Sequence, residues 1–109
     1  MAAAMSSEEI SEVGERHVIA DLTAKGFRCL RSRESTYSSV IQVFRGTELI
    51  CLVNAKTAIH PAVPESLSDE ESHNLKNRAT LMGGEAWLVQ VKINEAGQRL
   101  GPVSYIQLS

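Results

Sequence analysis

The sequence contains little of what would set it apart from ordinary small globular proteins. It has two cysteines, Cys29 and Cys51, among 109 residues, and aromatic residues make up 5% of the chain. Two thiols are too few to cross-link a secreted scaffold, so a reducing, cytoplasmic environment is expected. No apolar run approaches the roughly 20 residues that a membrane-spanning helix needs. Residues 1–5 are small and apolar but carry no basic region, so no signal peptide is predicted.

Two common ligand-binding patterns are missing as well. The histidines, His17, His60 and His73, have no histidine partner four residues away and no cysteine neighbour, which argues against zinc. Gly83 and Gly84 follow a predicted helix instead of opening one, so they indicate a C-cap and not a phosphate-binding loop.

Charge is unevenly distributed along the chain, although the net charge is only −2. Residues 25–58 hold six basic and two acidic residues, a net of +4, whereas the remainder holds five basic and eleven acidic residues, a net of −6. Such asymmetry is compatible with one basic face turned toward phosphates. A set of solvated strand ends would produce the same pattern.

The sequence predicts one α/β domain over residues 1–109, with residues 1–6 disordered. Ser6 with Glu9 and Ser68 with Glu71 are capping-box pairs, each of which predicts the start of a helix. The expected elements are a helix over 7–25, a strand over 27–33, a loop over 34–39, strands over 40–44 and 49–55, a loop over 59–67, a helix over 69–82, and strands over 86–93 and 102–108. Because the strand over 49–55 is almost wholly apolar, both of its faces should be covered.

Several segments, taken in order, resemble a known family. Gly14-Glu15-Arg16 lies in the first helix about three turns before Gly26-Phe27, a predicted hairpin spans 40–56, and Leu75-Lys76-Asn77-Arg78-Ala79 precedes the run Gly83-Gly84-Glu85-Ala86-Trp87-Leu88-Val89. In these motifs and their spacing the chain resembles the PD-(D/E)XK nuclease superfamily, and within it the archaeal-type Holliday-junction resolvases. The resemblance covers nearly the whole chain from residue 13 to residue 108.

The resemblance implies a restriction-endonuclease-like fold, with an αβββαβ core in which helices flank a mixed central sheet. It also implies metal-assisted phosphodiester hydrolysis. In that family an Asp at the start of the hairpin and a Glu two residues before a Lys hold one or two Mg²⁺ ions. Residues two apart on a strand share a face, which explains the Glu-x-Lys spacing.

The chain departs from the family at these positions. Lys56 stands at the lysine position, but Asn54 replaces the acid before it, and Ile41 stands where the Asp would fall. Of the family's carboxylates only Glu15 on the first helix has a counterpart. An amide supplies an oxygen ligand but no charge, and an aliphatic side chain supplies no ligand. We therefore expect no bound metal or cofactor and absent or feeble hydrolysis; an active form would be a Mg²⁺-dependent endodeoxyribonuclease.

Each of these residues also has a purely structural interpretation. Lys56 at the end of an apolar strand could extend its ammonium group into solvent, Glu15 could be an exposed helix acid, and Asn54 could cap the strand end. Metal-binding acids could have moved to Glu48 or to residues 69–71, although acids in a first helical turn also interact favourably with the helix dipole.

A basic set is expected to contact nucleic acid, and it could equally protect the sheet edge against aggregation. Its members are Arg28, Arg31, Arg33 and Arg45, joined by Lys56.

Two function classes follow from these observations. The first is a nucleic-acid-binding domain, with DNA as the partner, that descends from a nuclease and has lost or weakened hydrolysis. The second is a dimerisation or protein-interaction module, either a homodimer or bound to another protein, in which the strand over 49–53 and the strand of Trp87 meet the partner. An active endonuclease with relocated acidic ligands is a lesser alternative.

Overall fold

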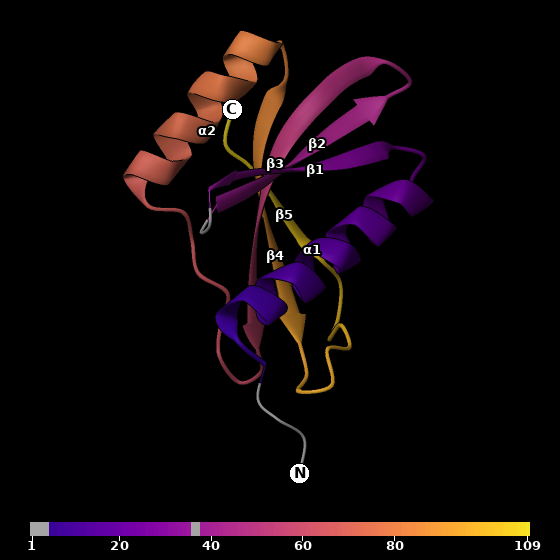
Figure 1. Cartoon of the computed structure of the whole chain (residues 1–109), viewed down its shortest axis with the longest axis vertical. Coiled ribbons are helices and arrows are strands. Elements are labelled where there is room, and N and C mark those ends of the chain that lie inside the picture. The colour runs from indigo at the N-terminus through magenta and orange to yellow at the C-terminus, as the bar shows by residue number, and fades with distance from the viewer. Residues whose placement is uncertain (1–4, 36–37) are drawn as a thin grey trace.

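The computed structural model describes residues 5–35 and 38–109. Its elements are α1 (Ser7–Ala24), β1 (Arg28–Ser35), β2 (Ser38–Arg45), β3 (Glu48–Ile59), α2 (Asp69–Met82), β4 (Glu85–Ile93) and β5 (Ser104–Gln107). This order confirms the predicted α-β-β-β-α-β-β arrangement (Figure 1). Within the described residues, no helix combines the length and the apolar character that crossing a membrane would require.

Both helices begin where the capping boxes predict. The Ser6 hydroxyl accepts a hydrogen bond from the Glu9 backbone N–H, and the Glu9 carboxylate accepts one from the Ser6 N–H, each at 3.1 Å. Ser68 and Glu71 form the same reciprocal pair at the start of α2. Two orphan backbone donors are satisfied at each helix start, which is why the boundaries are readable from sequence.

The five strands form a single sheet in the order β1-β2-β3-β4-β5. Strands β3 and β4 run parallel and are joined through α2, whereas the other neighbouring pairs are antiparallel. The sheet is therefore mixed, as expected. The central strand β3 is covered on both faces, and Cys51, Leu52 and Val53 at its middle are all buried.

The two helices cover opposite faces of this sheet (Figure 1). On one face, Val18 and Leu22 of α1 pack with a cluster that includes Ile41 and Val53. On the other face, Leu75 and Ala79 of α2 pack with a second cluster, whose sheet members are Val40, Leu52 and Ala86. Because side chains alternate along a strand, odd-numbered residues at the middle of β3 face α1 and even-numbered residues face α2.

Several predicted boundaries were wrong. The loop expected over 34–39 is largely strand, since β1 continues to Ser35 and β2 begins at Ser38, while residues 36 and 37 lie outside the described part of the chain. Strand β3 runs four residues past the expected end at 55, because parallel pairing with β4 satisfies its backbone as far as Ile59. The last strand is shorter than expected.

The disordered segment expected over 1–6 does not extend to its last two residues. Met5 packs against the α1-side core cluster, and Ser6 is the N-cap of α1. Residues 1–4 lie outside the described part of the chain.

Candidate functional site

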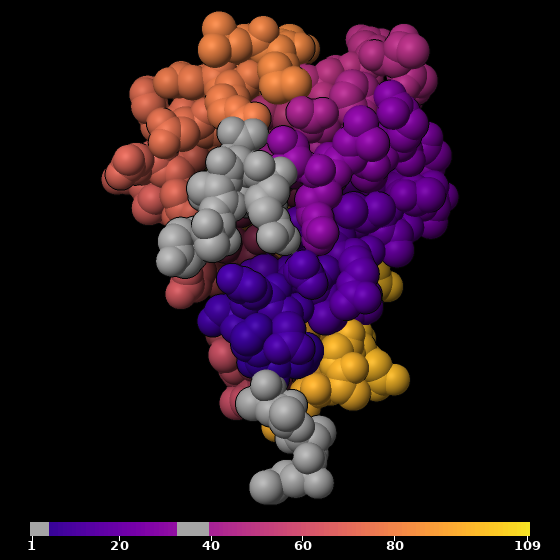
Figure 2. All heavy atoms as spheres, in the orientation of Figure 1, coloured from indigo at the N-terminus to yellow at the C-terminus, as the bar shows by residue number. Residues whose placement is uncertain are grey.

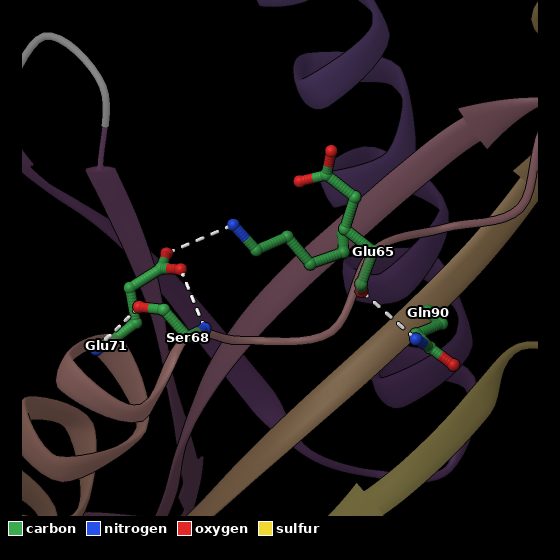
Figure 3. Close-up of polar contacts among 5 residues, drawn as sticks. Glu65, Ser68, Glu71 and Gln90 are labelled. Atoms are coloured by element: carbon green, nitrogen blue, oxygen red, sulfur yellow. Dashed lines mark hydrogen bonds and ion pairs between the residues drawn. The ribbon is translucent and has the colours of Figure 1, made fainter.

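Lys56 lies on the α2 side of the sheet, and its ammonium group is paired. The Nζ atom lies 3.1 Å from Oε2 of Glu71, at the first turn of α2 (Figure 3). Oε1 of the same carboxylate accepts the Ser68 backbone N–H of the capping box. That backbone hydrogen bond is the main cause that lowers the pKa of Glu71, and the contact with Lys56 lowers it further. One carboxylate therefore joins the start of α2 to the central strand.

The loop before α2 is fastened to the neighbouring strand. Gln90 on β4 is the register partner of Lys56. It donates through Nε2 to the backbone oxygen of Glu65 at 3.0 Å (Figure 3) and to that of Pro64 at 3.4 Å. These bonds hold the loop alongside Lys56.

Asn54 shares the α2 face with Lys56, but its cross-strand surroundings are apolar. The β2–β3 register pairs Ile41 with Val53, and continuing it by one residue places Val40 opposite Asn54. Val40 is 3% exposed and packs in the α2-side cluster. A residue on β2 that shared a metal ion with Asn54 would be expected at this cross-strand position. The position is occupied by a buried valine.

Ile41, the residue expected at the position of the family's Asp, faces the other way. It is 1% exposed and packs in the α1-side cluster. At the turn, Arg45 pairs with Glu48. If the pairing continued from there without a bulge, Ile41 would lie opposite Leu52. A bulge in β3 adds one residue between the pairs of Val43 and Phe44, so Ile41 meets Val53 instead. A one-residue shift moves a side chain to the opposite face.

Glu15 is buried and does not behave as the exposed helix acid considered above. It is 5% exposed, and its Oε2 lies 4.0 Å from Nε of Arg31 on β1, on the α1 side of the sheet. Within the described residues, Oε2 of Glu15 accepts no hydrogen bond, and the buried Oγ1 of Thr57 is also without one. Glu15 and Lys56 therefore each have an oppositely charged partner, on opposite sides of the sheet.

The expected remnant site is thus divided. Asn54 and Lys56 share the α2 face, as their spacing predicts, while Ile41 and Glu15 belong to the α1 side. Among the side chains that the structure describes, those of residues 5–32 and 40–109, no three His, Cys, Asp or Glu gather in a way that could hold a metal ion. A lone amide beside a lysine and a valine does not match the carboxylate-rich oxygen set that Mg²⁺ prefers.

The predicted basic set is also divided. Arg28 and Arg45 are exposed at the end of the sheet next to the β2–β3 turn, and each guanidinium lies over a phenylalanine ring. Arg31 is paired with Glu15 in the middle of β1. The side chain of Arg33 lies outside the described part of the structure.

Sequence reasoning missed a polar cluster that joins α1 to β5. The Tyr105 hydroxyl donates a hydrogen bond to Oδ2 of Asp21, while Lys25 and Arg99 lie 3.0 and 3.7 Å from the same carboxylate. Tyr105 and Lys25 lower the pKa of Asp21, and burial followed by the contact with Asp21 raises the pKa of Tyr105. Only Lys25, four residues after Asp21, carried a local signal.

No protein-family model matches the chain, and no curated protein matches its sequence. Among solved structures, the fold is similar to that of a Holliday junction resolvase from the archaeal hyperthermophile Archaeoglobus fulgidus. The TM-score is 0.64 at 17% sequence identity, over 90% of this chain and 72% of the resolvase chain. The similarity confirms the predicted nuclease-like α/β fold.

Proposed function

We propose that this chain is a nucleic-acid-binding protein with a nuclease-like fold and a lost metal-dependent phosphodiesterase site. The observation that carries the proposal is the environment of Lys56. Lys56 stands at the family's lysine position on β3, but its ammonium group is paired with Glu71. Its neighbour on the same face is Asn54, and the residue across from Asn54 is the buried Val40.

Loss of hydrolysis follows from the chemistry of these groups. A metal-activated water needs a cation that is held by negative oxygen ligands. Glu71 is the nearest acid to Lys56, yet both of its oxygens already accept hydrogen bonds, one from Ser68 and one from Lys56. Recruiting Glu71 to a cation would remove the helix cap and the ion pair together. This cost also counts against the relocated-ligand alternative.

Nucleic-acid binding is supported by the fold and by exposed positive charge. A nuclease-like framework that no longer cuts can still bind phosphates. The segment from 25 to 58 carries a net charge of +4, although Lys25, Arg31 and Lys56 are paired with acids from outside the segment. Arg28 and Arg45 are exposed cationic side chains at the end of the sheet next to the β2–β3 turn. A reducing, cytoplasmic location belongs to the same proposal.

The interaction-module alternative has less support from the two strands on which it was based. The strand over 49–53 lies at the centre of the sheet, with its middle buried between the two helices. Trp87 packs against the α1-side core, and its indole N–H donates to Glu85 at 3.2 Å. A partner could not reach Cys51, Leu52 or Val53 without opening the core, whereas Leu49, Ile50 and Trp87 keep partial exposure.

The proposal is tested by measuring binding and cleavage on the same DNA. Mobility shifts on a duplex and on a four-way junction should show complexes that weaken steeply with added salt. Incubation with Mg²⁺ or Mn²⁺ should leave both DNAs intact, for the wild type and for Lys56→Ala alike.

Two results would contradict the proposal. One is an absence of complexes even at the lowest salt concentration. The other is cleavage by the wild type that Lys56→Ala abolishes and that the exposed-lysine control Lys92→Ala retains.

A further inference from the structure

Two arginine–phenylalanine stacks stand at one end of the sheet, next to the β2–β3 turn. The guanidinium carbon of Arg28 lies 4.7 Å from the centre of the Phe44 ring, and that of Arg45 lies 5.2 Å from the centre of the Phe27 ring. Both arginines are exposed, and both rings are half-buried. This end of the sheet occupies a corner of the molecule, and the residues of the β2–β3 turn are among the magenta atoms at the upper right of Figure 2.

The two stacks lie on opposite faces of the sheet. Arg28 and Phe44 are direct cross-strand partners, and Phe44 in turn pairs with Leu49, which packs in the α2-side cluster. Arg45 follows Phe44 on the same strand, so it points to the other face, and its ring partner Phe27 packs in the α1-side cluster. The corner therefore presents one guanidinium on each side.

Both guanidinium groups are available for a ligand. Stacking occupies the flat face of a guanidinium and leaves the N–H groups at its edge directed outward, which is the geometry that grips a phosphate. Arg28 makes one long hydrogen bond, 3.5 Å to the Gly46 oxygen. Over the part of the chain that the structure describes, no carboxylate lies within 4.0 Å of either guanidinium, although Glu48 is the register partner of Arg45.

We infer that this corner straddles the groove of double-stranded DNA, with Arg28 on the phosphates of one strand and Arg45 on those of the other. The inference rests on the proposed nucleic-acid binding and adds where and how the nucleic acid is held. A β-ribbon fits the major groove of B-DNA, which has a phosphate backbone on each side. A single strand has one backbone, and to reach both arginines it would have to pass around the turn, where Glu48 is exposed.

The test uses Arg28→Gln, Arg45→Gln and the double variant, because glutamine keeps much of the stem over the ring and removes the charge. The control, Lys76→Gln with Lys92→Gln, removes two exposed charges elsewhere. Unchanged thermal unfolding shows that all variants are folded. Fluorescence anisotropy is recorded with a labelled duplex, and with one strand of it alone, between about 50 and about 200 mM salt.

On the duplex, each single substitution should reduce the slope of log affinity against log salt by about 0.9, and the double substitution by about 1.8. On the single strand, the double variant should lose only one contact, a slope change of about 0.7. The lysine control should leave both slopes unchanged.

The inference is overturned, with the proposed function intact, if the wild type binds the duplex and the double arginine variant behaves like the lysine control. Equal loss of contacts on the duplex and the single strand also overturns it. Absence of wild-type binding to either DNA removes both proposals.

Discussion

At the scale of single residues, close contacts decide which side chains can take part in chemistry. Glu71 uses both carboxylate oxygens, one on the Ser68 backbone and one on Lys56. Glu15 is buried beside Arg31, which leaves its carboxylate with no path to Lys56 on the other face. The residues that resemble a catalytic set have therefore become parts of two separate structural contacts.

The contact of Gly14 with Thr57 makes a prediction at this scale. A methyl group added at Gly14 would lie 1.7 Å from Oγ1 of Thr57, so Gly14→Ala should destabilise the fold by about 1–3 kcal/mol. Helix propensity alone would predict the opposite sign, since Ala is favoured over Gly by about 1 kcal/mol. Urea unfolding measures the change.

Thr57→Ala in the Gly14→Ala background provides the control. It removes Oγ1 and the methyl carbon of Thr57 but leaves its Cβ, 2.7 Å from the added methyl group, so the rescue should be partial. A Gly14→Ala variant at least as stable as the wild type would show that α1 can move away from β3 without cost.

At the scale of elements, polar contacts attach α1 to the last part of the chain. Asp21 near the end of the helix accepts from Tyr105 on β5, and His17 lies 2.8 Å from the Gly97 oxygen through Nε2. Strand β5 has only four residues and pairs with β4 alone. These side-chain contacts therefore add to the apolar packing of Val103 and Tyr105 in holding this part of the chain against the helix.

This attachment should depend on pH. The pKa of Asp21 in the folded protein is lowered from its ordinary value of 3.8, chiefly by Tyr105 and then by Lys25. The stabilisation that the Asp21 carboxylate provides is therefore present in full above pH 3.8 and is lost as the pH falls through the pKa of Asp21 in the folded protein. Asp21→Asn should cost about 1.5–3 kcal/mol at neutral pH, and the difference from the wild type should shrink in acid.

Urea unfolding at neutral and acidic pH measures the Asp21 effect. Glu95→Gln in the turn after β4 is the control, since Glu95 is exposed and should change stability by less than about 0.5 kcal/mol. If Asp21→Asn lowers the free energy of unfolding by the same amount at every pH, the attribution of the pH dependence to Asp21 is wrong.

At the scale of the whole molecule, one sheet separates two chemically different sides. The α1 side holds Glu15 with Arg31, and the α2 side holds Lys56 with Glu71. Among the described side chains, arginines lie on both sides of the sheet at its end next to the β2–β3 turn. The overall charge of −2 therefore conceals a local basic corner. Under the proposed function that corner, and not Lys56, is where phosphate contact is expected.

The layered arrangement predicts an order of local opening. Backbone amides of β3 and β4, which pair on both sides and lie between the helices, should exchange with deuterium last. Amides of β5 and of residues 94–103 should exchange first, because they lie at or beyond one sheet edge. Hydrogen-exchange mass spectrometry on peptides from these regions checks the order, and β5 protection equal to that of β3 would contradict it.

The sequence by itself determined the helix starts, the order of the elements and the shared face of Asn54 and Lys56. Capping boxes, β-branched runs and strand alternation depend on a few neighbouring residues, so they can be recognised in the sequence alone. Only the tertiary structure decided that Ile41 turns to α1, that Val40 lies across from Asn54, and that Glu71 holds Lys56. One bulged residue in β3 shifts the β2–β3 register, so that Ile41 lies on the face opposite to that of Asn54 and Lys56. No local sequence pattern predicts that shift.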